Sequence, residues 1–403
     1  MSWKLVSLND VTSKIGDGLH GTPKYDEKGQ YYFVNGNNFN NGKIEIKPLT
    51  KKINEDQYQK IKKNINDETL FVSINGTLGN VALYRGEKIA LGKSACYLNV
   101  DKNVSRLFIK YVLEGDSFQG YAHTFATGST IKNLGLKAVR DYKFNLPELN
   151  TQKKIASILS TYDDLIDNNL KRIQLLEEAA QRIYKEWFVD FKFPDHENTP
   201  INPETGLPEG WERKEIQEIA ETIGGGTPST KNPEYWESGN IRWFSPTDLS
   251  KNSSLVLLDS AKKINEFGLK KSSAKLLPPK TILMSSRATI GLFGLIDSEC
   301  STNQGFINII PRGEEYRYYI LFNLMSRKSE LEAYASGATF KELSKTNFRK
   351  MEIINPSENI ANSFNSIVEE FFKSLKNLAQ QNQNLKEARD LLLPRMMNRA
   401  IEV

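Results

Sequence analysis

The chain has 403 residues, of which 39% are hydrophobic and 26% are charged, and its formal net charge at pH 7 is +5. A chain of this length can bury more than one core, so we expect two or more domains. No apolar run reaches the roughly 18 residues that a membrane-spanning helix needs, and the opening MSWKLVSLND lacks a signal-peptide pattern. This argues against a membrane protein, and we expect a cytoplasmic one.

The residue types that catalysis and metal binding need are scarce. Cys96 and Cys300 are the only cysteines, too few for a disulfide framework or a cysteine metal site. The three histidines lie far apart in the sequence, so neither a metal centre nor a Ser/His/Asp triad can be assembled with them. We therefore expect a binding protein without catalytic residues, a metal site or a cofactor of its own.

Residues 1–147 are predicted to form a first globular domain of α/β type. The runs LFVSI at 70–74 and VALYR at 81–85 indicate strands joined by a glycine-containing turn, and SRLFIKYVL at 105–113 indicates a helix. Pro147 ends the domain, because proline disfavours helix in the residue before it. The segment carries a net charge of +7, which suits an anionic partner such as nucleic acid.

Residues 148–192 are predicted to form a long helix that packs along a partner helix. The apolar stripe recurs at steps of three and four and comprises Ile155, Ile158, Tyr162, Leu165, Asn169, Ile173, Leu176, Ala180, Ile183 and Trp187. Asn169 either fixes the register of the helix pair or lies half exposed at its edge. Asp163 and Asp167 share one helical face, which we expect to be solvated. The aromatic run WFVDF at 187–191 either packs the helix end against the second domain or forms a docking patch.

Residues 193–210, rich in Pro, Asn and Gly, are predicted to be a linker to a second globular domain at 211–356. In this domain ILMSS at 282–286 and LFGLI at 292–296 indicate strands, and YRYYILFNLMS at 316–326 indicates a helix.

Residues 357–403 are predicted to form a second long helix. Its stripe comprises Ile360, Phe364, Ile367, Phe371, Leu375, Leu378, Asn382, Leu385, Leu392 and Met396. Because each long helix ends where a domain or the chain terminus follows, the two can pair antiparallel with a globular domain at each end, whereas parallel pairing would need a connection along the whole helix.

The two halves repeat one another. ATGSTIKNL at 126–134 resembles ASGATFKEL at 335–343, and TLFVSINGTLGNVALYRGE at 69–87 resembles TILMSSRATIGLFGLIDSE at 281–299. The fold class that follows is α+β, with two globular α/β domains joined by two long antiparallel coiled-coil helices and related by a pseudo-twofold internal repeat.

Small polar and basic residues occur at equivalent turns of both copies, where they can supply donors and acceptors for base edges and phosphates. In the first copy they are Gly18, His20, Thr22, Asn35, Asn37, Asn38, Asn75, Thr77, Lys93, Ser94, Thr127, Ser129, Thr130 and Lys132. In the second copy they are Thr227, Ser229, Thr230, Lys231, Ser245, Thr247, Asp248, Ser285, Ser286, Arg287, Thr289, Asn303, Gln304, Thr339 and Lys341. For any single residue, ordinary turn chemistry is the simpler explanation. Because the frame is alike and the polar residues differ, we interpret the copies as readers of two different DNA half-sites.

Four stretches closely resemble the specificity subunit of type I restriction-modification systems. They are STYDDLIDNN at 160–169, YKEWFVDFKFP at 184–194, GLPEGW at 206–211 and LLLPRMMN at 391–398. With the duplicated architecture, the resemblance covers essentially the whole chain, although the globular repeats match only loosely.

The resemblance implies two target-recognition domains that each read one half of an asymmetric, bipartite target in double-stranded DNA, with the helices setting the spacer. It also implies docking of two methyltransferase subunits and, through them, of translocating endonuclease subunits. Adenine N6 methylation would use S-adenosylmethionine held by the methyltransferase, with the target base flipped out, and ATP and magnesium would belong to the endonuclease. No catalytic residue carries over to this chain.

The sequence leaves two alternatives open. A self-contained methyltransferase or nuclease is disfavoured by the missing motifs. A coiled-coil scaffold or adaptor that binds only protein partners is separated from a DNA reader by specific binding of a bipartite duplex.

Overall fold

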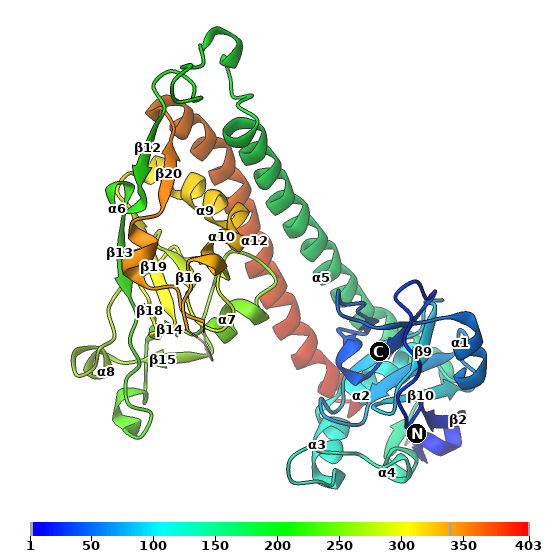
Figure 1. Ribbon diagram of the computed structural model, residues 1–403. Helices are drawn as coiled ribbons and strands as arrows, with labels where there is room; N and C mark the ends of the chain where they lie inside the picture. Colours follow the sequence, from blue (N-terminus) through cyan, green and yellow to red (C-terminus); the bar gives the residue numbers. More distant parts are fainter. Residues whose placement is uncertain (1–2, 338–340, 402–403) are drawn as a thin grey trace. The chain divides into compact units, whose positions relative to one another are not determined.

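The structure, a computed structural model, describes residues 3–337 and 341–401 (Figure 1). The chain divides into two compact units. Unit 1 comprises Met1–Asp164 and Leu385–Val403, and unit 2 comprises Leu165–Asn384. Each unit thus combines a globular domain with parts of both long helices.

The domain of unit 1 is built on an antiparallel sheet with strand order β2-β10-β7-β8. A smaller sheet has the order β6-β3-β9, in which β3 and β9 run parallel, and β1-β11 and β4-β5 form separate pairs. The strands are β1 (Lys4–Ser7), β2 (Thr12–Asp17), β3 (Tyr31–Val34), β4 (Phe39–Asn40), β5 (Lys43–Ile44), β6 (Lys52–Ile53), β7 (Thr69–Ser73), β8 (Val81–Leu83), β9 (Ile89–Leu91), β10 (Ala95–Val100) and β11 (Lys143–Leu146).

Short helices pack against these sheets and against one another. They are α1 (Glu55–Ile61), α2 (Arg106–Glu114), α3 (Asp116–Phe125) and α4 (Leu136–Asp141). Helix α2 begins where the Ser105 side chain accepts a hydrogen bond from the Phe108 backbone amide, a typical N-cap. Its buried residues include Phe108 and Ile109, which are completely buried in the core of unit 1. The helix predicted at 105–113 is therefore confirmed.

Apart from the β4–β5 pair, the described residues of unit 2 repeat this topology. Its main antiparallel sheet has the order β13-β19-β16-β17, its smaller sheet has the order β15-β14-β18 with β14 and β18 parallel, and β12 pairs with β20. The strands are β12 (Glu212–Glu215), β13 (Ala220–Gly224), β14 (Ile241–Phe244), β15 (Lys262–Ile264), β16 (Ile282–Ser285), β17 (Phe293–Leu295), β18 (Ser301–Thr302), β19 (Phe306–Pro311) and β20 (Glu352–Asn355). The short helices are α6 (Ile216–Ile219), α7 (Pro246–Lys251), α8 (Glu266–Lys270), α9 (Arg317–Ser326), α10 (Lys328–Ala333) and α11 (Lys345–Arg349).

Individual hydrogen bonds are repeated as well. Arg106, at the start of α2, donates to the Tyr84 carbonyl at 2.9 Å, and Arg317, at the start of α9, donates to the Ile296 carbonyl at 2.9 Å. Each arginine thus holds its helix to the end of an equivalent strand. The internal repeat predicted from the sequence is confirmed in topology and in these contacts.

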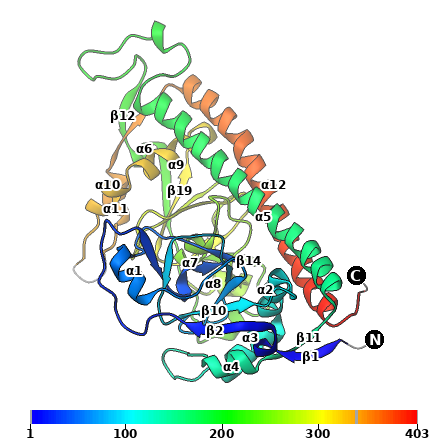
Figure 2. The same cartoon turned by 90° about the vertical axis from the view of Figure 1, so that its right-hand side faces the viewer.

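The two long helices are α5 (Leu149–Tyr184), which continues as one π-helical turn (Lys185–Val189), and α12 (Glu358–Met397). Each begins two residues after a proline, Pro147 or Pro356, as predicted. Within unit 2 the helices lie side by side (Figures 1 and 2). There Asn169 contacts Asn382, whereas Tyr184 contacts Phe364, so the pair is antiparallel.

The predicted apolar stripe is wrong by one residue near residue 158 of α5 and near residue 367 of α12, where the helix packs against a globular domain. Ile158 and Ile367 are 38% and 39% exposed, whereas the adjoining Leu159 and Val368 are completely buried. Leu165 is likewise exposed and Ile166 buried. Each of these segments packs against a globular domain as well as against the other long helix, so the buried face is rotated relative to a simple helix pair.

The aromatic run at 187–191 packs inside unit 2, which is the first of the two alternatives that the sequence left open, rather than forming a docking patch. The Phe188 ring lies 4.7 Å from Tyr319 and 5.0 Å from Phe364. The predicted linker is partly incorporated in the same core, because Phe193 is buried and its ring stacks 5.1 Å from that of Trp211.

Candidate nucleic-acid interface

In unit 1, backbone and side-chain hydrogen bonds tie together turns that lie far apart in the sequence. Leu19 bridges to Gly92 at the end of β9, and Gly92 donates to the Val34 carbonyl at 2.8 Å. The Ser94 hydroxyl donates to Asn35 Oδ1 at 2.9 Å.

The remaining turns of unit 1 join the same cluster. The Ile74 amide donates to the Ser94 carbonyl at 3.0 Å, and the Gly76 amide donates to the Lys132 carbonyl at 3.1 Å. Asn75 Nδ2 also donates to Asn133 Oδ1 at 3.2 Å. Segments 18–20, 34–38, 74–77, 92–94 and 127–134 therefore form one surface region, which we call turn cluster 1.

Unit 2 gathers the equivalent segments in turn cluster 2, formed by 225–231, 244–248, 285–289, 302–305 and 341–343. Gly226 donates to the Thr302 carbonyl at 2.8 Å, and Asn303 donates to the Phe244 carbonyl at 2.9 Å. The Ser286 amide donates to the Gly305 carbonyl at 2.8 Å and the Leu343 amide to the Ser286 carbonyl at 3.0 Å. The Thr227 hydroxyl also contacts Gln304 Oε1.

The two clusters share a frame but present different side chains. An antiparallel bridge joins Asn75 to Asn133 in unit 1, and an equivalent bridge joins Arg287 to Glu342 in unit 2. The first pair forms an amide hydrogen bond, whereas the second forms an ion pair with Arg287 Nε 2.8 Å from Glu342 Oε1. An amide and a guanidinium offer different hydrogen-bonding patterns to a base pair, so equivalent places can read different bases.

Most of the predicted site residues lie at the surface of these clusters, except that Thr22 is exposed just beyond segment 18–20. Exposed in unit 1 are His20, Thr22, Asn37, Thr77, Lys93, Thr127, Ser129, Thr130 and Lys132, and exposed in unit 2 are Ser229, Thr230, Lys231, Thr247, Arg287, Thr289, Gln304 and Lys341. Asn35, Asn75, Ser94, Thr227, Ser245, Asp248 and Asn303 are half-buried. Thr339 lies outside the described residues.

Four predicted residues are buried parts of the frame. Asn38 Nδ2 donates to the Glu45 carbonyl at 2.9 Å and to Thr50 Oγ1 at 3.1 Å, and Ser285 Oγ accepts from the Leu292 amide at 2.9 Å. Ser286 is 2% exposed, and a Cβ on the buried Gly18 would lie 2.2 Å from the Leu91 carbonyl oxygen. Their hydrogen bonds and close packing support the turns, so we leave them out of the candidate interface.

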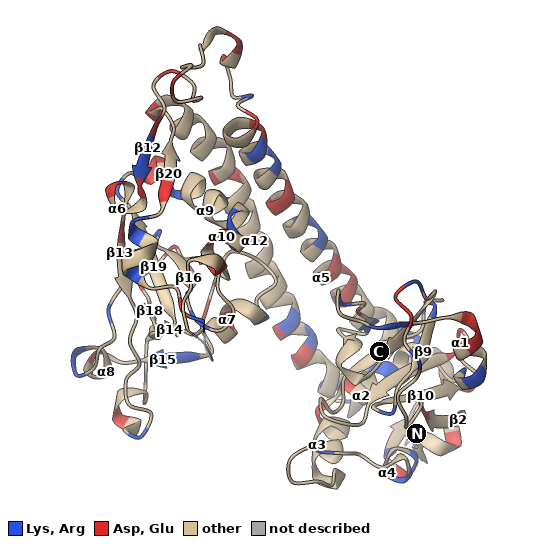
Figure 3. Ribbon diagram, viewed as in Figure 1, with Lys and Arg blue, Asp and Glu red and all other residues tan. Residues whose placement is uncertain are grey.

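Four lysines that were not among the predicted site residues flank turn cluster 2. Lys262, Lys270, Lys271 and Lys275 are exposed around β15 and α8, where Figure 3 shows a concentration of basic residues. This segment adjoins the cluster, because a Cβ on Gly226 would lie 2.3 Å from the Ser273 backbone. Ammonium groups in this position can neutralise DNA phosphates. Lysine is so common on solvated surfaces that the sequence pattern alone did not distinguish them.

One residue of cluster 2 has a strained backbone. Ala288 has φ 59°, a left-handed conformation that costs an alanine roughly 1–2 kcal/mol. The equivalent residue of cluster 1 is Gly76, with φ 76°, which adopts the conformation without that cost.

The helix pair contains the two asparagines that the sequence placed on the seam. Asn169 is 7% exposed and Asn382 is 5% exposed, and Asn169 Nδ2 donates to Asn382 Oδ1 at 3.0 Å. A buried amide pair is satisfied only when the two residues face each other, so it favours one register. The register interpretation of these residues is therefore supported over half-exposed edge positions.

Asp163 is not part of a solvated face, contrary to the expectation from its helical position. Its Oδ2 lies 2.7 Å from Lys110 Nζ and accepts from the Tyr111 hydroxyl at 2.7 Å, while Oδ1 accepts from Arg389 Nη1 at 2.6 Å. Only 5% of the Lys110 side chain is exposed. The helical pattern could not reveal these partners, because α2 is distant in sequence.

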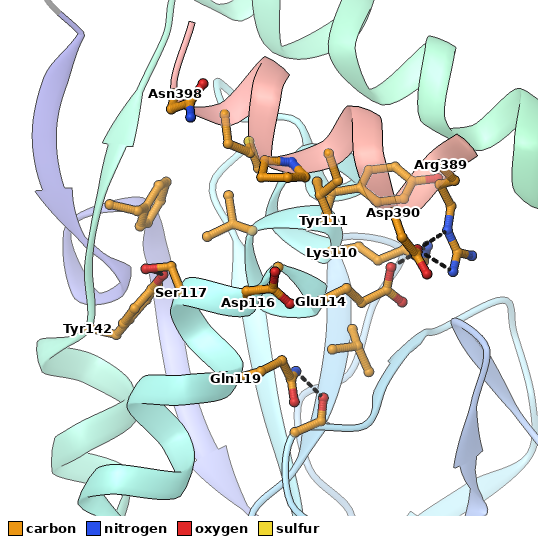
Figure 4. A pocket seen from close by; sticks show the side chains of 18 of the residues that line it. Lys110, Tyr111, Glu114, Asp116, Ser117, Gln119, Tyr142, Arg389, Asp390 and Asn398 are labelled. Carbon is orange, nitrogen blue, oxygen red and sulfur yellow. Dashed lines mark hydrogen bonds and ion pairs between the residues drawn. The ribbon is translucent and has the colours of Figure 1, made fainter. Parts of the chain in front are cut away.

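These charged groups line a cavity of about 750 Å³ within unit 1 (Figure 4). Burial raises the pKa of Asp163, but the Lys110 charge and the bonds from Lys110, Arg389 and Tyr111 outweigh it and hold the pKa below its ordinary value. Burial raises the pKa of Glu114, although Lys110 Nζ lies 2.8 Å from its carboxylate. Since these charges pair with one another, we interpret the cluster as a structural junction between α2 and the long helices.

Within residues 3–337 and 341–401, no group of three His, Cys, Asp or Glu side chains is placed to hold a metal ion. None of the helices in the same residues is both long and apolar enough to cross a membrane.

Comparisons with known proteins agree with the duplicated fold. The family described as "Type I restriction modification DNA specificity domain" matches residues 1–178 and 208–387. The type I restriction enzyme MjaIX specificity subunit of Methanocaldococcus jannaschii is 35% identical over 184 residues, which are 45% of this chain and 42% of that protein, so the match spans less than half of this relative. The HindI specificity subunit of Haemophilus influenzae is 28% identical over 330 residues, which are 67% of this chain and 71% of that protein.

A crystal structure of the type I restriction-modification S subunit from M. genitalium has the same fold. It superposes with a TM-score of 0.58 at 18% identity, covering 98% of this chain and 96% of that one.

Proposed function

The chain belongs to the family of type I restriction-modification DNA specificity domains, and we propose that it reads an asymmetric, two-part target in double-stranded DNA. Turn cluster 1 reads one half-site and turn cluster 2 the other, through exposed polar residues that contact base edges and lysines that contact phosphates. The chain supplies recognition, and catalysis belongs to partner subunits.

The observation that supports this proposal is a difference between two equivalent residue pairs, Asn75–Asn133 in unit 1 and Arg287–Glu342 in unit 2. Both occupy one position of a shared backbone frame, yet one offers amides and the other a charged pair. A scaffold that only held protein partners would have no need for unlike polar groups at matched turns. Two readers of unlike half-sites need that difference.

The helices α5 and α12 are the proposed ruler for the unread spacer. Their register is favoured by the buried Asn169–Asn382 pair. Inserting seven residues after Arg172 and seven after Leu378, which keeps the antiparallel partners matched, adds roughly 10 Å of helix. Because a base pair rises about 3.4 Å, the spacer is expected to lengthen by about three base pairs. An unchanged spacer would show that the helices do not set it.

The proposed partners are two methyltransferase subunits and, through them, endonuclease subunits. Support comes from the relatives, which are named specificity subunits of type I restriction enzymes. S-adenosylmethionine would be held by the methyltransferase, and ATP and magnesium by the endonuclease. Purified chain alone is then expected to leave DNA unmodified.

In vitro selection from a random duplex pool tests the proposal against the protein-only adaptor. We expect the chain, with its methyltransferase partner, to enrich two unlike sequence blocks separated by a spacer of fixed length and free sequence. Enrichment of no sequence, while the partner still binds, would favour the adaptor.

A further inference from the structure

One apolar side chain stands at the tip of turn cluster 1. The hairpin at 127–133 closes through two backbone hydrogen bonds between Thr127 and Asn133, at 2.9 and 2.8 Å. Between these residues the sequence is GSTIK, and Ile131 is 61% exposed. Figure 1 shows the loop between α3 and α4, which contains this hairpin, projecting from the domain.

The hairpin holds Ile131 out on a fixed support. The next apolar residue, Leu134, is completely buried, and its amide donates to the Ile74 carbonyl at 2.8 Å. Gly128 has φ 102°, and a Cβ there would lie 2.3 Å from the Ile131 carbonyl oxygen, so the close turn requires glycine. The fold therefore buries the base of the hairpin and presents its tip.

The neighbours of Ile131 fit a nucleic-acid surface. Ser129, Thr130 and Lys132 are exposed, and their hydroxyl and ammonium groups can bond phosphates and base edges. In the aligned repeat the matching residue is Phe340, also large and apolar, which lies outside the described residues. An apolar side chain surrounded by such groups is the arrangement with which DNA-binding proteins enter a base stack.

We propose that Ile131 is a wedge that inserts between two base pairs of the half-site read by unit 1. This inference rests on the proposed function. Insertion separates the stacked bases at one step, transfers the Ile131 side chain from water to the base faces, and makes the readout at that step depend on how easily the bases unstack.

The test uses the full chain without its methyltransferase partner, so that no target adenine is flipped. The duplexes are those that the selection enriched, with 2-aminopurine placed in turn at each adenine of both half-sites. For wild type we expect 2-aminopurine fluorescence to rise at one step of one half-site. Ile131→Ala is expected to bind about ten-fold more weakly, as loss of a buried aliphatic side chain implies, and to abolish that rise. Its slope of log affinity against log salt is expected to stay unchanged, because no phosphate contact is lost.

Two further variants control the experiment. Ile131→Phe, which copies the second repeat, is expected to keep both the affinity and the fluorescence rise. Leu5→Ala removes an equally exposed side chain, also at 61%, from β1, which pairs with β11, and is expected to bind DNA as wild type does. Thermal unfolding of each variant checks that its fold is intact.

The outcomes separate this inference from the proposed function. Wild type that enriches a bipartite duplex, with Ile131→Ala binding it equally tightly or keeping the fluorescence rise, would overturn the wedge alone. Intact DNA binding by Ile131→Ala with weakened assembly with the methyltransferase would assign Ile131 to a protein interface instead. Failure of wild type to enrich any duplex would overturn the proposed function, and the wedge with it.

Discussion

In unit 1, helix α2 meets the long helices through charged groups, whereas in unit 2 the equivalent helix α9 meets α12 mainly through aromatic rings, together with one hydrogen bond from the Tyr318 hydroxyl to Glu369 Oε2 at 2.7 Å. Lys110, Tyr111 and Arg389 surround Asp163. The residue of α12 that the repeat aligns with Asp163 is Phe372, whose ring stacks on Tyr318 at 4.6 Å and lies 6.3 Å from Phe322.

The difference shows that the two repeats keep the contact between the short helix and the long helices at the same place, but make it with different kinds of side chain. A buried ion cluster pays a desolvation cost that aromatic packing does not, so it is weak evidence for stability. We therefore expect the junction of unit 2 to be the more robust and that of unit 1 to depend on pH. The turn clusters differ in the same way, with amides in one and an ion pair in the other on a common frame.

The largest effect is expected from Phe372→Ala. The side chain is 4% exposed, and removing a buried ring typically costs about 3–5 kcal/mol in the free energy of unfolding. Urea unfolding followed by tryptophan fluorescence would report it, because Trp187, Trp211, Trp236 and Trp243 lie in unit 2. Phe371→Ala, at the half-buried neighbour, is the matched control. A loss no larger than that of the control would contradict the aromatic junction.

A smaller loss, about 2 kcal/mol in the free energy of unfolding, is expected from Asp163→Asn. Breaking a fully buried pair costs about 3–5 kcal/mol and a surface pair about 0–1, and Asp163 is 23% exposed. Exchange protection of α2 amides at pH 7, measured by hydrogen exchange, should fall in this variant. The exposed neighbour in Asp164→Asn is the control and should leave protection unchanged.

The difference in stability between wild type and Asp163→Asn should depend on pH in one direction. Because the folded-state pKa of Asp163 lies below its ordinary value of 3.8, its stabilising contribution is fully present above that value and is lost as pH falls through the folded pKa. In wild type and variant alike, Lys110, Tyr111 and Arg389 surround position 163, and Glu114 pairs with Lys110. The difference between wild type and Asp163→Asn should therefore narrow in acid. A difference that grows as pH falls would contradict the ion cluster.

The smallest change in the free energy of unfolding is expected at the equivalent turn positions Ala288 and Gly76, whose side chains differ by one methyl group. Ala288→Gly should raise the free energy of unfolding of unit 2 by roughly 0.5–1 kcal/mol, because relief of the left-handed strain exceeds the added chain entropy. Gly76→Ala should lower that of unit 1 by a similar amount, since its Cβ would meet no atom within 4 Å and only the backbone is strained. Thermal unfolding measures both changes. Shifts of the same sign in the two variants would show that the turns are not equivalent.

Much of the fold was predictable, because the repeat and the two apolar stripes are long enough to survive local variation. The predicted stripes are wrong at Ile158 and Ile367. There, packing against a globular domain decides which face of the helix is buried, and the helical period of the sequence carries no information about that packing. Asp163 was misjudged for the same reason, since its partners Lys110 and Tyr111 come from a distant helix.

The candidate site was predictable as a set of turns rather than as single residues. Asn37 and Asn38 adjoin and share a residue type, yet the first is exposed and the second has its amide satisfied inside the fold. Which of two such residues faces outward depends on the turn geometry. Ile131 gave no signal either, because an apolar residue in a sequence is ordinarily assigned to the core.

Turn clusters 1 and 2 are proposed to be unlike readers on one frame that act on separate half-sites. Long-read mapping of N6-methyladenine in cells that express the chain with its methyltransferase partner tests this proposal most directly, for wild type and for Arg287→Ala of turn cluster 2. We predict two unlike blocks with a fixed spacer for wild type, and for Arg287→Ala a relaxed sequence in one block with the other block and the spacer unchanged. A single uninterrupted or palindromic motif for wild type, or a change in both blocks for the variant, would contradict it.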